Sequence, residues 1–288
     1  MNTVGVDIGG TNIRAVLLNE HQQIVKENIR STHPERGPDE IIEEINEITA
    51  FVKENEKVGA IGIGSPGPLD PWKGVIKSPP NLPGWENVPL KEMMEQYWGV
   101  PVFVENDANC AALAEAVKGI GADAESIFYL TVSTGVGGSY IVNKEIIHGK
   151  DGFSGEVGYM MMNSGKSFKD AVSGKALEKQ CQSAGIPGNV RQLFYLAEVE
   201  KEEISAGIVD QFTTNLSILL ANVIFLLNPE KLILGGGVMA SSSYFLGQLK
   251  EKTNHLVYPK FKKEAEIYDA LSGQKAGAIG AALLPHYR

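Results

Sequence analysis

The sequence predicts an α/β fold that is divided into two domains. Its 288 residues exceed what a single hydrophobic core usually supports. Apolar segments typical of strands alternate along the chain with segments whose apolar residues recur at helical spacing. A strand, a glycine-rich turn and a second strand occur twice, at residues 4–18 and 127–142. This repetition suggests that the two halves of the chain arose by duplication.

The first half of the chain contains one of these hairpins, two helices and two further strands. The hairpin spans residues 4–18, and a polar turn follows it. Pro38 opens a helix that carries isoleucines on one face, and residues 58–63 return as a strand. Residues 99–104 form another strand, and an alanine-rich helix spans residues 105–118. The residues that join this strand to this helix are therefore expected at a strand's carboxyl end.

The second half repeats the hairpin at residues 127–142 and then becomes mainly helical. Helices are predicted at residues 171–184 and 202–227, followed by a short strand at 232–234 and a last helix at 277–284. No linker or low-complexity segment interrupts the sequence, so the two domains should be closely joined.

The predicted domain boundaries follow from this order of elements. We expect the N-terminal α/β domain to comprise residues 1–112 plus 275–288, and the C-terminal α/β domain to comprise residues 113–274.

Charge and composition exclude several classes of partner. Lys and Arg total 26 against 35 Asp and Glu, a formal charge of −9 that would repel a nucleic-acid backbone. The apolar stretch 216–227 is too short to span a bilayer and predicts a buried helix. The N-terminus does not resemble a signal peptide, and Cys110 and Cys181 form no C-x-x-C pair. We therefore expect a cytoplasmic protein that binds neither nucleic acid nor membrane.

Three glycine-rich turns are candidates for holding the phosphates of a nucleotide, because their backbone N–H groups can point inward without Cβ atoms in the way. Each turn alone is more often a simple tight turn, but three of them flanked by strands favour the phosphate interpretation. Asp7, one residue before the first turn, could hold Mg²⁺ through water. The predicted nucleotide-binding residues are Asp7, Gly9, Gly10, Thr11, Asn12, Thr134, Gly135, Gly137, Gly138, Gly235, Gly236 and Gly237.

The two common nucleotide fingerprints are absent from the sequence. There is no G-x-x-x-x-G-K-[ST] motif, and no G-x-G-x-x-G opens a helix after the first strand. A P-loop kinase and a Rossmann dehydrogenase are therefore disfavoured.

Two carboxylates are candidates for binding or activating a hydroxyl group. Asp107 lies near the start of a predicted helix, whose positive end would keep it ionised and able to accept a proton. Its neighbour Asn106 can donate and accept hydrogen bonds. Glu156 stands close to Tyr159, a pairing suited to sugar hydroxyls and an apolar ring face. The alternatives are a helix-terminal acid at Asp107 and a loop acid beside a core tyrosine at Glu156.

Taken together, these motifs resemble the ROK family of sugar kinases and sugar-responsive regulators. The resemblance implies an actin-like (ribonuclease H-like) two-domain α/β fold with a central cleft for ATP and sugar. The matching segments are DIGGTN at 7–12, SPGPLDP at 65–71, SPPNLPGW at 78–85, VENDANCAALAE at 104–115, LTVSTGVGG at 130–138, GEVGYM at 155–160, VSGKAL at 172–177, ILGGGV at 233–238 and AGAIGAALL at 276–284.

From the resemblance we expect an ATP- and Mg²⁺-dependent kinase that phosphorylates the primary hydroxyl of a hexose, with a homodimer as the assembly. Asp107 would be the catalytic base, and the glycine turns would hold ATP. The residues implied in sugar binding are Gly67, Asn81, Asn106, Asp107, Glu156 and Tyr159. A glucokinase-like activity is the first expectation, and an N-acetylmannosamine kinase or a β-glucoside kinase is the alternative.

The sequence departs from many members of the family in its zinc motif. Those members have a histidine where Tyr159 stands here, followed by a cysteine-rich segment that binds zinc and carries a sugar-contacting glutamate. The corresponding stretch 163–170 contains no cysteine, and Lys169 falls about where that glutamate would be. We therefore predict that the structural zinc is absent.

Two interpretations from other classes remain. A non-catalytic sugar sensor would resemble the family's repressors, which carry a helix-turn-helix domain ahead of this module, whereas six residues precede Asp7 here. An actin-like structural protein would need the nucleotide loops but no sugar site. Asn106, Asp107 and Glu156 favour the enzyme over the structural protein, and the acidic charge also argues against the sensor.

Overall fold

The computed structural model describes residues 1–261 and 263–287, and these form two units. Unit 1 comprises Met1–Gly119, Lys144–Ser154 and Gln274–Arg288, and unit 2 comprises Ile120–Asn143 and Gly155–Gly273. The predicted domains differ because they assigned residues 113–119, 144–154 and 274 to the second domain. Residues 113–119 stay with unit 1 because the helix that contains them runs unbroken from Asp107 to Lys118.

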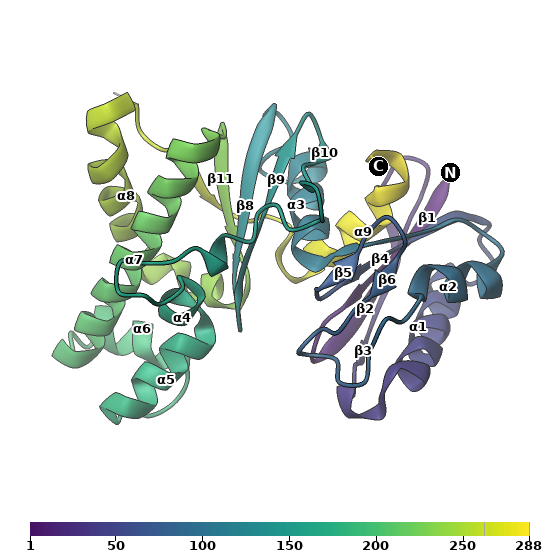
Figure 1. Ribbon diagram of the computed structural model, residues 1–288, viewed down its shortest axis with the longest axis horizontal. Helices are drawn as coiled ribbons and strands as arrows, with labels where there is room; N and C mark the ends of the chain where they lie inside the picture. Colours follow the sequence, from purple (N-terminus) through teal and green to yellow (C-terminus); the bar gives the residue numbers. More distant parts are fainter. Residues whose placement is uncertain (262, 288) are drawn as a thin grey trace. The chain divides into compact units, whose positions relative to one another are not determined.

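Unit 1 is built on a sheet of strand order β3-β2-β1-β4-β7 (Figure 1). Strands β1, β2 and β3 are antiparallel neighbours, whereas β4 runs parallel to both β1 and β7. The strands of this unit are β1(Asn2–Ile8), β2(Asn12–Leu18), β3(Ile24–Ser31), β4(Val58–Ser65), β5(Leu69–Asp70), β6(Val75–Ile76), β7(Val102–Asn106) and β10(Glu145–Ile146). Its helices are η1(Pro34–Arg36), α1(Pro38–Lys53), α2(Leu90–Trp98), α3(Asp107–Lys118) and α9(Ala276–Tyr287), which follows η4(Gly273–Lys275).

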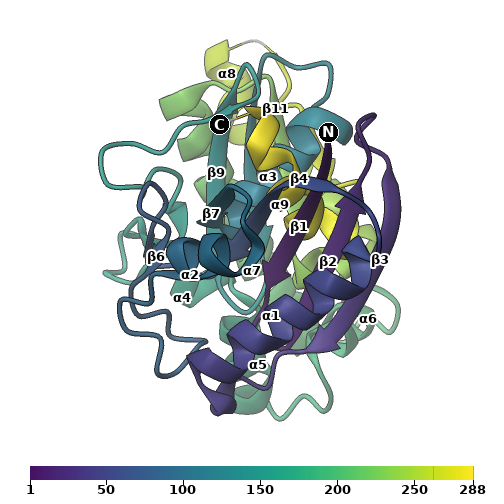
Figure 2. The same ribbon diagram turned by 90° about the vertical axis from the view of Figure 1, so that its right-hand side faces the viewer.

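Helices cover both faces of the unit 1 sheet. Alternate residues of β1 point to opposite faces, so each set packs against a different helix. Val4 and Val6 join a buried cluster with the isoleucines of α1, which lies across β1, β2 and β3 in Figure 2. Thr3 and Gly5 face α9 instead: Thr3 Oγ1 donates to the Ala282 carbonyl at 2.8 Å, and a Cβ at Gly5 would overlap the α9 backbone. The absence of a side chain at Gly5 lets α9 approach the sheet closely.

The junction between β7 and α3 lies two residues later than the sequence indicates. The predicted strand 99–104 and helix 105–118 appear as β7(Val102–Asn106) and α3(Asp107–Lys118), because Gly99 caps the end of α2. Glu105 and Asn106 therefore belong to the strand, and Asn106 is the residue that caps the helix.

Unit 2 repeats this design. Its sheet contains the order β9-β8-β11-β12, with β8 antiparallel to β9 and parallel to β11. The arrangement of β9, β8 and β11 thus matches that of β2, β1 and β4 in unit 1, as expected for a duplication. The elements are β8(Ser126–Val132), β9(Val136–Val142), β11(Lys231–Gly235), β12(Ile267–Asp269), η2(Val157–Tyr159), α4(Lys169–Val172), α5(Gly174–Ala184), α6(Val190–Glu198), α7(Glu203–Leu227), η3(Gly237–Tyr244) and α8(Leu246–Phe261).

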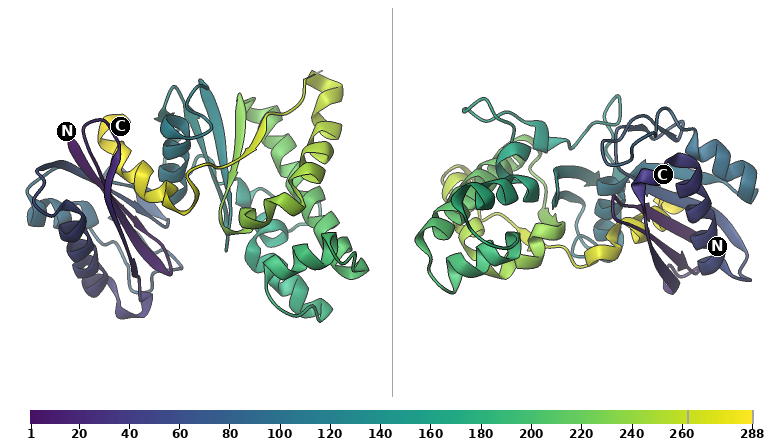
Figure 3. Two further views of the ribbon diagram at one scale, coloured as in Figure 1. Left: turned by 180° about the vertical axis from the view of Figure 1, so that it is seen from behind. Right: turned by 90° about the horizontal axis from the view of Figure 1, so that it is seen from below.

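The core of unit 2 forms around α7, which lies with α8 on one face of the sheet (Figure 3). Phe194 of α6, Phe212 of α7 and Phe245 pack with ring centroids 4.8–5.7 Å apart. The apolar stretch predicted at 216–227 is the second half of a 25-residue helix, which is long and apolar enough to cross a membrane. The length argument against a membrane span is therefore wrong. Burial of 61% of its most apolar window supports the predicted buried helix.

Candidate active site

Parallel pairing brings the predicted residues of unit 1 to one edge of its sheet. Asp7 pairs with Gly64 near the end of β4, and the next residue of β4, Ser65, pairs with Asn106 at the end of β7. Asp107 follows as the first residue of α3, and its charge acts on the Asp7 carboxyl. Two segments far apart in sequence thus contribute two carboxylates and an amide to a single edge of the sheet.

The Asp7 carboxyl lies in a crowded environment. Burial raises its pKa from the ordinary value of 3.8 to about 7, the negative charge of Asp107 adds to the rise, and Arg14 opposes it. Gly277 at the start of α9 has no room for a side chain, since a Cβ there would lie 2.5 Å from Asp7 Oδ2. Asp7 is therefore held between a second acid and a helix backbone.

These surroundings suit a magnesium ion at Asp7. Carboxylate oxygens are the ligands that Mg²⁺ prefers, and a divalent cation would offset the repulsion between Asp7 and Asp107. When bound, the ion would neutralise phosphate charge; Asp7 is the residue that would hold it.

The first glycine turn is tighter than its sequence indicates. Gly9 N donates to the Asn12 carbonyl at 2.9 Å, and Asn12 is already the first residue of β2. Thr32, which follows β3 and is 2% exposed, fixes the turn: its Oγ1 donates to the Gly9 carbonyl at 2.6 Å and its N donates to the Thr11 carbonyl at 2.9 Å. Sequence reasoning missed Thr32, because nothing in its own segment indicates this contact.

The side chains of Asn106 and Asp107 are both engaged with the start of α3. Asn106 Oδ1 accepts hydrogen bonds from the backbone N of Ala108 at 2.9 Å and of Asn109 at 3.4 Å. Asp107 Oδ1 accepts from Ala108 N at 2.8 Å. Because its oxygen serves the cap, Asn106 presents its amide Nδ2 as a donor, rather than donating and accepting equally as its residue type predicts.

Two further predicted sugar-binding residues lie near this edge. A Cβ at Gly67 would lie 3.4 Å from Asn106 Nδ2, so the Asn106 amide lies close to the Gly67 backbone. A Cβ at Gly10 would lie 3.7 Å from the Asn81 Cβ, which places exposed Asn81 beside the first glycine turn. The structure therefore gathers Gly67, Asn81 and Asn106 around the Asp7 and Asp107 edge of unit 1.

The other two glycine turns lie side by side in unit 2. They follow the adjacent parallel strands β8 and β11, in which Thr131 pairs with Gly235. Ser133 links them to a third element: Ser133 O accepts from Gly174 N at 2.7 Å, and a Cβ at Gly237 would lie 3.6 Å from Ser133 Oγ. Gly174 begins α5, so the start of this helix is held beside the glycine turns, and its first N–H is used in that contact. The role of Gly174 was missed by sequence reasoning.

The second turn is shorter than predicted. It is closed by the hydrogen bond from Ser133 N to the Gly135 carbonyl at 2.9 Å, and Gly137 and Gly138 lie inside β9. A Cβ at Gly138 would lie 2.9 Å from the Gly155 carbonyl. Of the predicted nucleotide-binding residues in this segment, Thr134 and Gly135 occupy the turn itself, while Gly138 allows the backbone before Glu156 to pack against β9.

Glu156, Tyr159 and Lys169 form a small polar group in unit 2. Burial raises the pKa of the half-buried Glu156 carboxyl above its ordinary value, and the positive charge of Lys169 opposes this rise. Lys169 Nζ donates to Tyr159 Oη at 3.4 Å, and its Cε would lie 3.7 Å from a Cβ at Gly135. Tyr159 is 61% exposed, so it is not the core tyrosine of the alternative interpretation.

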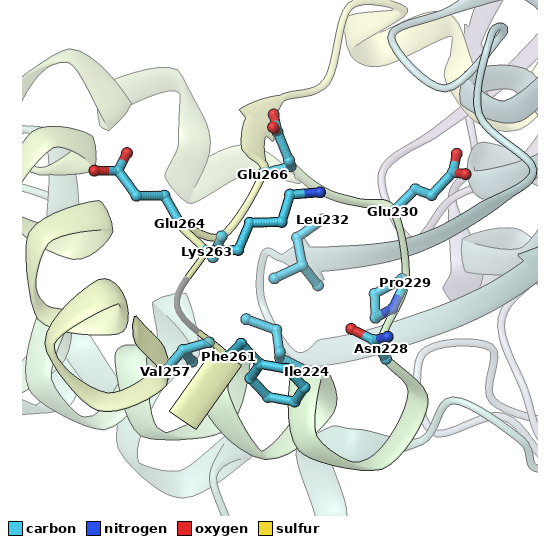
Figure 4. Close-up of a pocket in the computed structure, with 11 residues that line it drawn as sticks. Ile224, Asn228, Pro229, Glu230, Leu232, Val257, Phe261, Lys263, Glu264 and Glu266 are labelled. Carbon is cyan, nitrogen blue, oxygen red and sulfur yellow. The ribbon is translucent and has the colours of Figure 1, made fainter. Parts of the chain in front are cut away.

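Unit 2 also contains a pocket of about 220 Å³ (Figure 4). It is found at the amino end of β11, whereas the glycine loop follows the carboxyl end. Ile224, Val257 and Phe261 line its apolar part, and Glu230 and Lys263 supply charge. Among the described residues that line it, none is a predicted site residue. In residues 1–261 and 263–287 no group of three or more His, Cys, Asp or Glu side chains is placed to hold a metal ion.

The sequence is similar to several characterised proteins. A family model described as the ROK family matches residues 3–288. The glucokinase of Thermotoga maritima is 31% identical over 98% of this chain and 96% of its own length. The beta-glucoside kinase of Listeria monocytogenes is 30% identical over 98% of this chain and 96% of its own. The xylose repressor of Bacillus subtilis is 29% identical over 96% of this chain and 75% of its own.

Solved structures show the same likeness. The ROK hexokinase of Thermus thermophilus matches with a TM-score of 0.88 at 32% identity, covering 98% of this chain and 97% of its own. A ROK family glucokinase from Streptomyces griseus, in complex with glucose and AMPPNP, matches with a TM-score of 0.82 at 27% identity, covering 99% of both chains.

Proposed function

Because the chain belongs to the ROK family and has its actin-like ATPase fold, we propose that it is an ATP-dependent kinase that phosphorylates the primary hydroxyl of a hexose. The observation that carries this proposal is the shared sheet edge of Asp7 and Asp107. Phosphoryl transfer requires neutralisation of phosphate charge and a carboxylate that activates the acceptor, and these two residues provide the two functions separately.

Each group then has one task in the reaction. Asp107 accepts the proton of the attacking hydroxyl, while Asn106 Nδ2 donates to a sugar oxygen and Glu156 accepts from a sugar hydroxyl. The backbone N–H groups of the glycine turns bind the nucleotide phosphates. In this division of roles the protein supplies mainly positioning and electrostatic stabilisation, as phosphoryl transfer demands.

A screen of acceptors tests this proposal. ADP release from ATP is measured by a coupled assay in the presence of Mg²⁺. The sugars tested one at a time are glucose, N-acetylmannosamine, N-acetylglucosamine, fructose and cellobiose. We expect turnover that depends on at least one sugar, with glucose tried first because the matched proteins include glucokinases. Tight binding of a sugar without turnover would instead support the sensor function suggested by the similarity to a xylose repressor.

Substitution of Glu156 tests the sugar-binding role. Glu156→Gln keeps the side chain's size but replaces a charged acceptor by a weaker one. Because a hydrogen bond to a charged group contributes about 1.5–3 kcal/mol and one between neutral groups about 0.5–1.5 kcal/mol, KM for the sugar should rise about tenfold while KM for ATP changes little. The exposed Glu125→Gln serves as the matched control in the same unit. An unchanged sugar KM would remove Glu156 from the site.

A further inference from the structure

A buried carboxylate stands directly before the proposed sugar-binding residues. Glu105, the penultimate residue of β7, is 1% exposed. Its Oε1 accepts hydrogen bonds from the backbone N of Asn106 at 2.9 Å and from Asn109 Nδ2 at 3.0 Å. Its Oε2 lies 2.7 Å from His148 Nε2. Burying a carboxylate is costly unless its oxygens are hydrogen-bonded, so these partners are what make Glu105 tolerable in this position.

His148 reaches Glu105 from a distant segment of unit 1. It follows β10, 43 positions along the chain from Glu105, and its ring packs against Trp72 with centroids 5.6 Å apart. Ser154 N donates to the His148 carbonyl at 3.1 Å, which closes the loop that carries the imidazole. With its proton on Nε2, the imidazole donates to the carboxylate and fixes the rotation of the Glu105 side chain.

The orientation of Glu105 matters for the next two residues. Its Oε1 holds the peptide N–H of Asn106, and the Asn106 side chain in turn caps α3 and sets the start of the helix at Asp107. A turned Glu105 side chain would release this peptide and let the Asn106 amide and the Asp107 carboxylate shift together. Misplacement by about 1 Å can reduce turnover about 10²-fold.

We propose that His148 is a positioning residue, which fixes Asn106 and Asp107 through Glu105 for removal of the sugar proton. This proposal rests on the proposed roles of Asn106 and Asp107. The proposal gives a role to Glu105 and His148, which take no direct part in the phosphoryl transfer. Neither residue needs to touch the substrate.

The first test compares His148→Ala, which removes the donor, with His148→Gln, whose amide Nε2 can still donate. We expect His148→Ala to lower kcat about 10- to 100-fold, with KM for ATP within about twofold of the wild-type value. His148→Gln, or imidazole added to His148→Ala, should recover most of the loss. The control is His21→Ala in an exposed turn, where no change is expected.

A double-mutant cycle tests the route through Glu105. If His148 acts through that carboxylate, His148→Ala should cost little more in kcat once Glu105→Gln is present. Full additivity of the two losses would contradict the proposed route.

Hydrogen exchange separates this proposal from the proposed kinase activity. The backbone amides of residues 105–109 should exchange faster in His148→Ala than in the wild type, and His148→Gln should restore their protection. If the wild type turned over no sugar, the kinase proposal would fail while this measurement would still decide on positioning. Unchanged exchange, or a lowered melting temperature in both variants with normal kcat per folded molecule, would overturn the role of His148.

Discussion

Replacing Asp107 by Asn should abolish most of the turnover while leaving the fold intact. The amide keeps the size of the side chain and can still accept from Ala108 N at the start of α3. It cannot take the proton of the sugar hydroxyl. General-base catalysis contributes about 10²–10⁴-fold, so kcat should fall by at least about 10²-fold. Steady-state kinetics together with a melting curve measures both effects.

A matched control distinguishes catalysis from helix capping. Asp39 occupies the first turn of α1, is exposed and lies in the same unit, so Asp39→Asn changes an equivalent helix-terminal acid. We expect Asp39→Asn to keep full activity. If Asp107→Asn retained turnover within about threefold of the wild type, Asp107 would be only a helix-terminal acid, and Glu156 would become the next candidate for the base.

Replacing Asp7 by Asn should make the protein less active and more stable at once. Loss of the carboxylate that holds Mg²⁺ through water should lower kcat/KM for ATP about 10- to 100-fold, the usual effect of a residue that orients a metal's ligands. The gain in stability follows from the raised pKa of Asp7, because the native state disfavours the charged form that the unfolded chain adopts freely.

The pH dependence of this gain has a defined sign. The pKa of Asp7 is about 7 in the folded protein and 3.8 as its ordinary value, so the native state binds more protons between these values. The wild type therefore loses stability as pH rises through this range, by at most about 4 kcal/mol. In metal-free buffer, the excess stability of Asp7→Asn should grow from near zero below pH 4 to a plateau above pH 7. A constant difference across this range would contradict the buried charge.

The sequence predicted those parts of the site whose signal is local. The hairpins β1–β2 and β8–β9 appear as expected, since each consists of apolar strands joined by a glycine turn. The residues that join the strand to the alanine-rich helix were expected at a strand's carboxyl end, and Asn106 does end β7. The ROK resemblance is confirmed over residues 3–288.

The missed parts depend on contacts between distant segments or on weak local patterns. Thr32 lies 23 positions from Gly9, and His148 lies 43 positions from Glu105. The predicted helix 171–184 is divided into α4 and α5, because extended Ser173 accepts from Ala176 N at 3.1 Å and so starts a new helix. That serine cap was a readable signal.

Several elements were not predicted at all. Strand β3 is missed because it lies at the sheet edge and buries none of its residues completely, so it lacks the continuous apolar run of β1. Helix α8 carries Pro259 inside it and buries only three residues, which weakens its helical periodicity. Helices α2 and α6 were also missed, each being nine residues long.

We propose that this chain transfers a phosphoryl group from ATP to a sugar hydroxyl. The most direct test of this proposal is detection of the product: the protein is incubated with Mg²⁺, ATP and the best acceptor of the screen, and the phosphorylated sugar is quantified by ³¹P NMR. We expect one sugar phosphate per ADP, with the phosphate on the primary hydroxyl, and at least about 10²-fold slower formation of both products with Asp107→Asn. ADP formed without sugar phosphate, or sugar bound with no ADP formed, would contradict the proposed kinase activity.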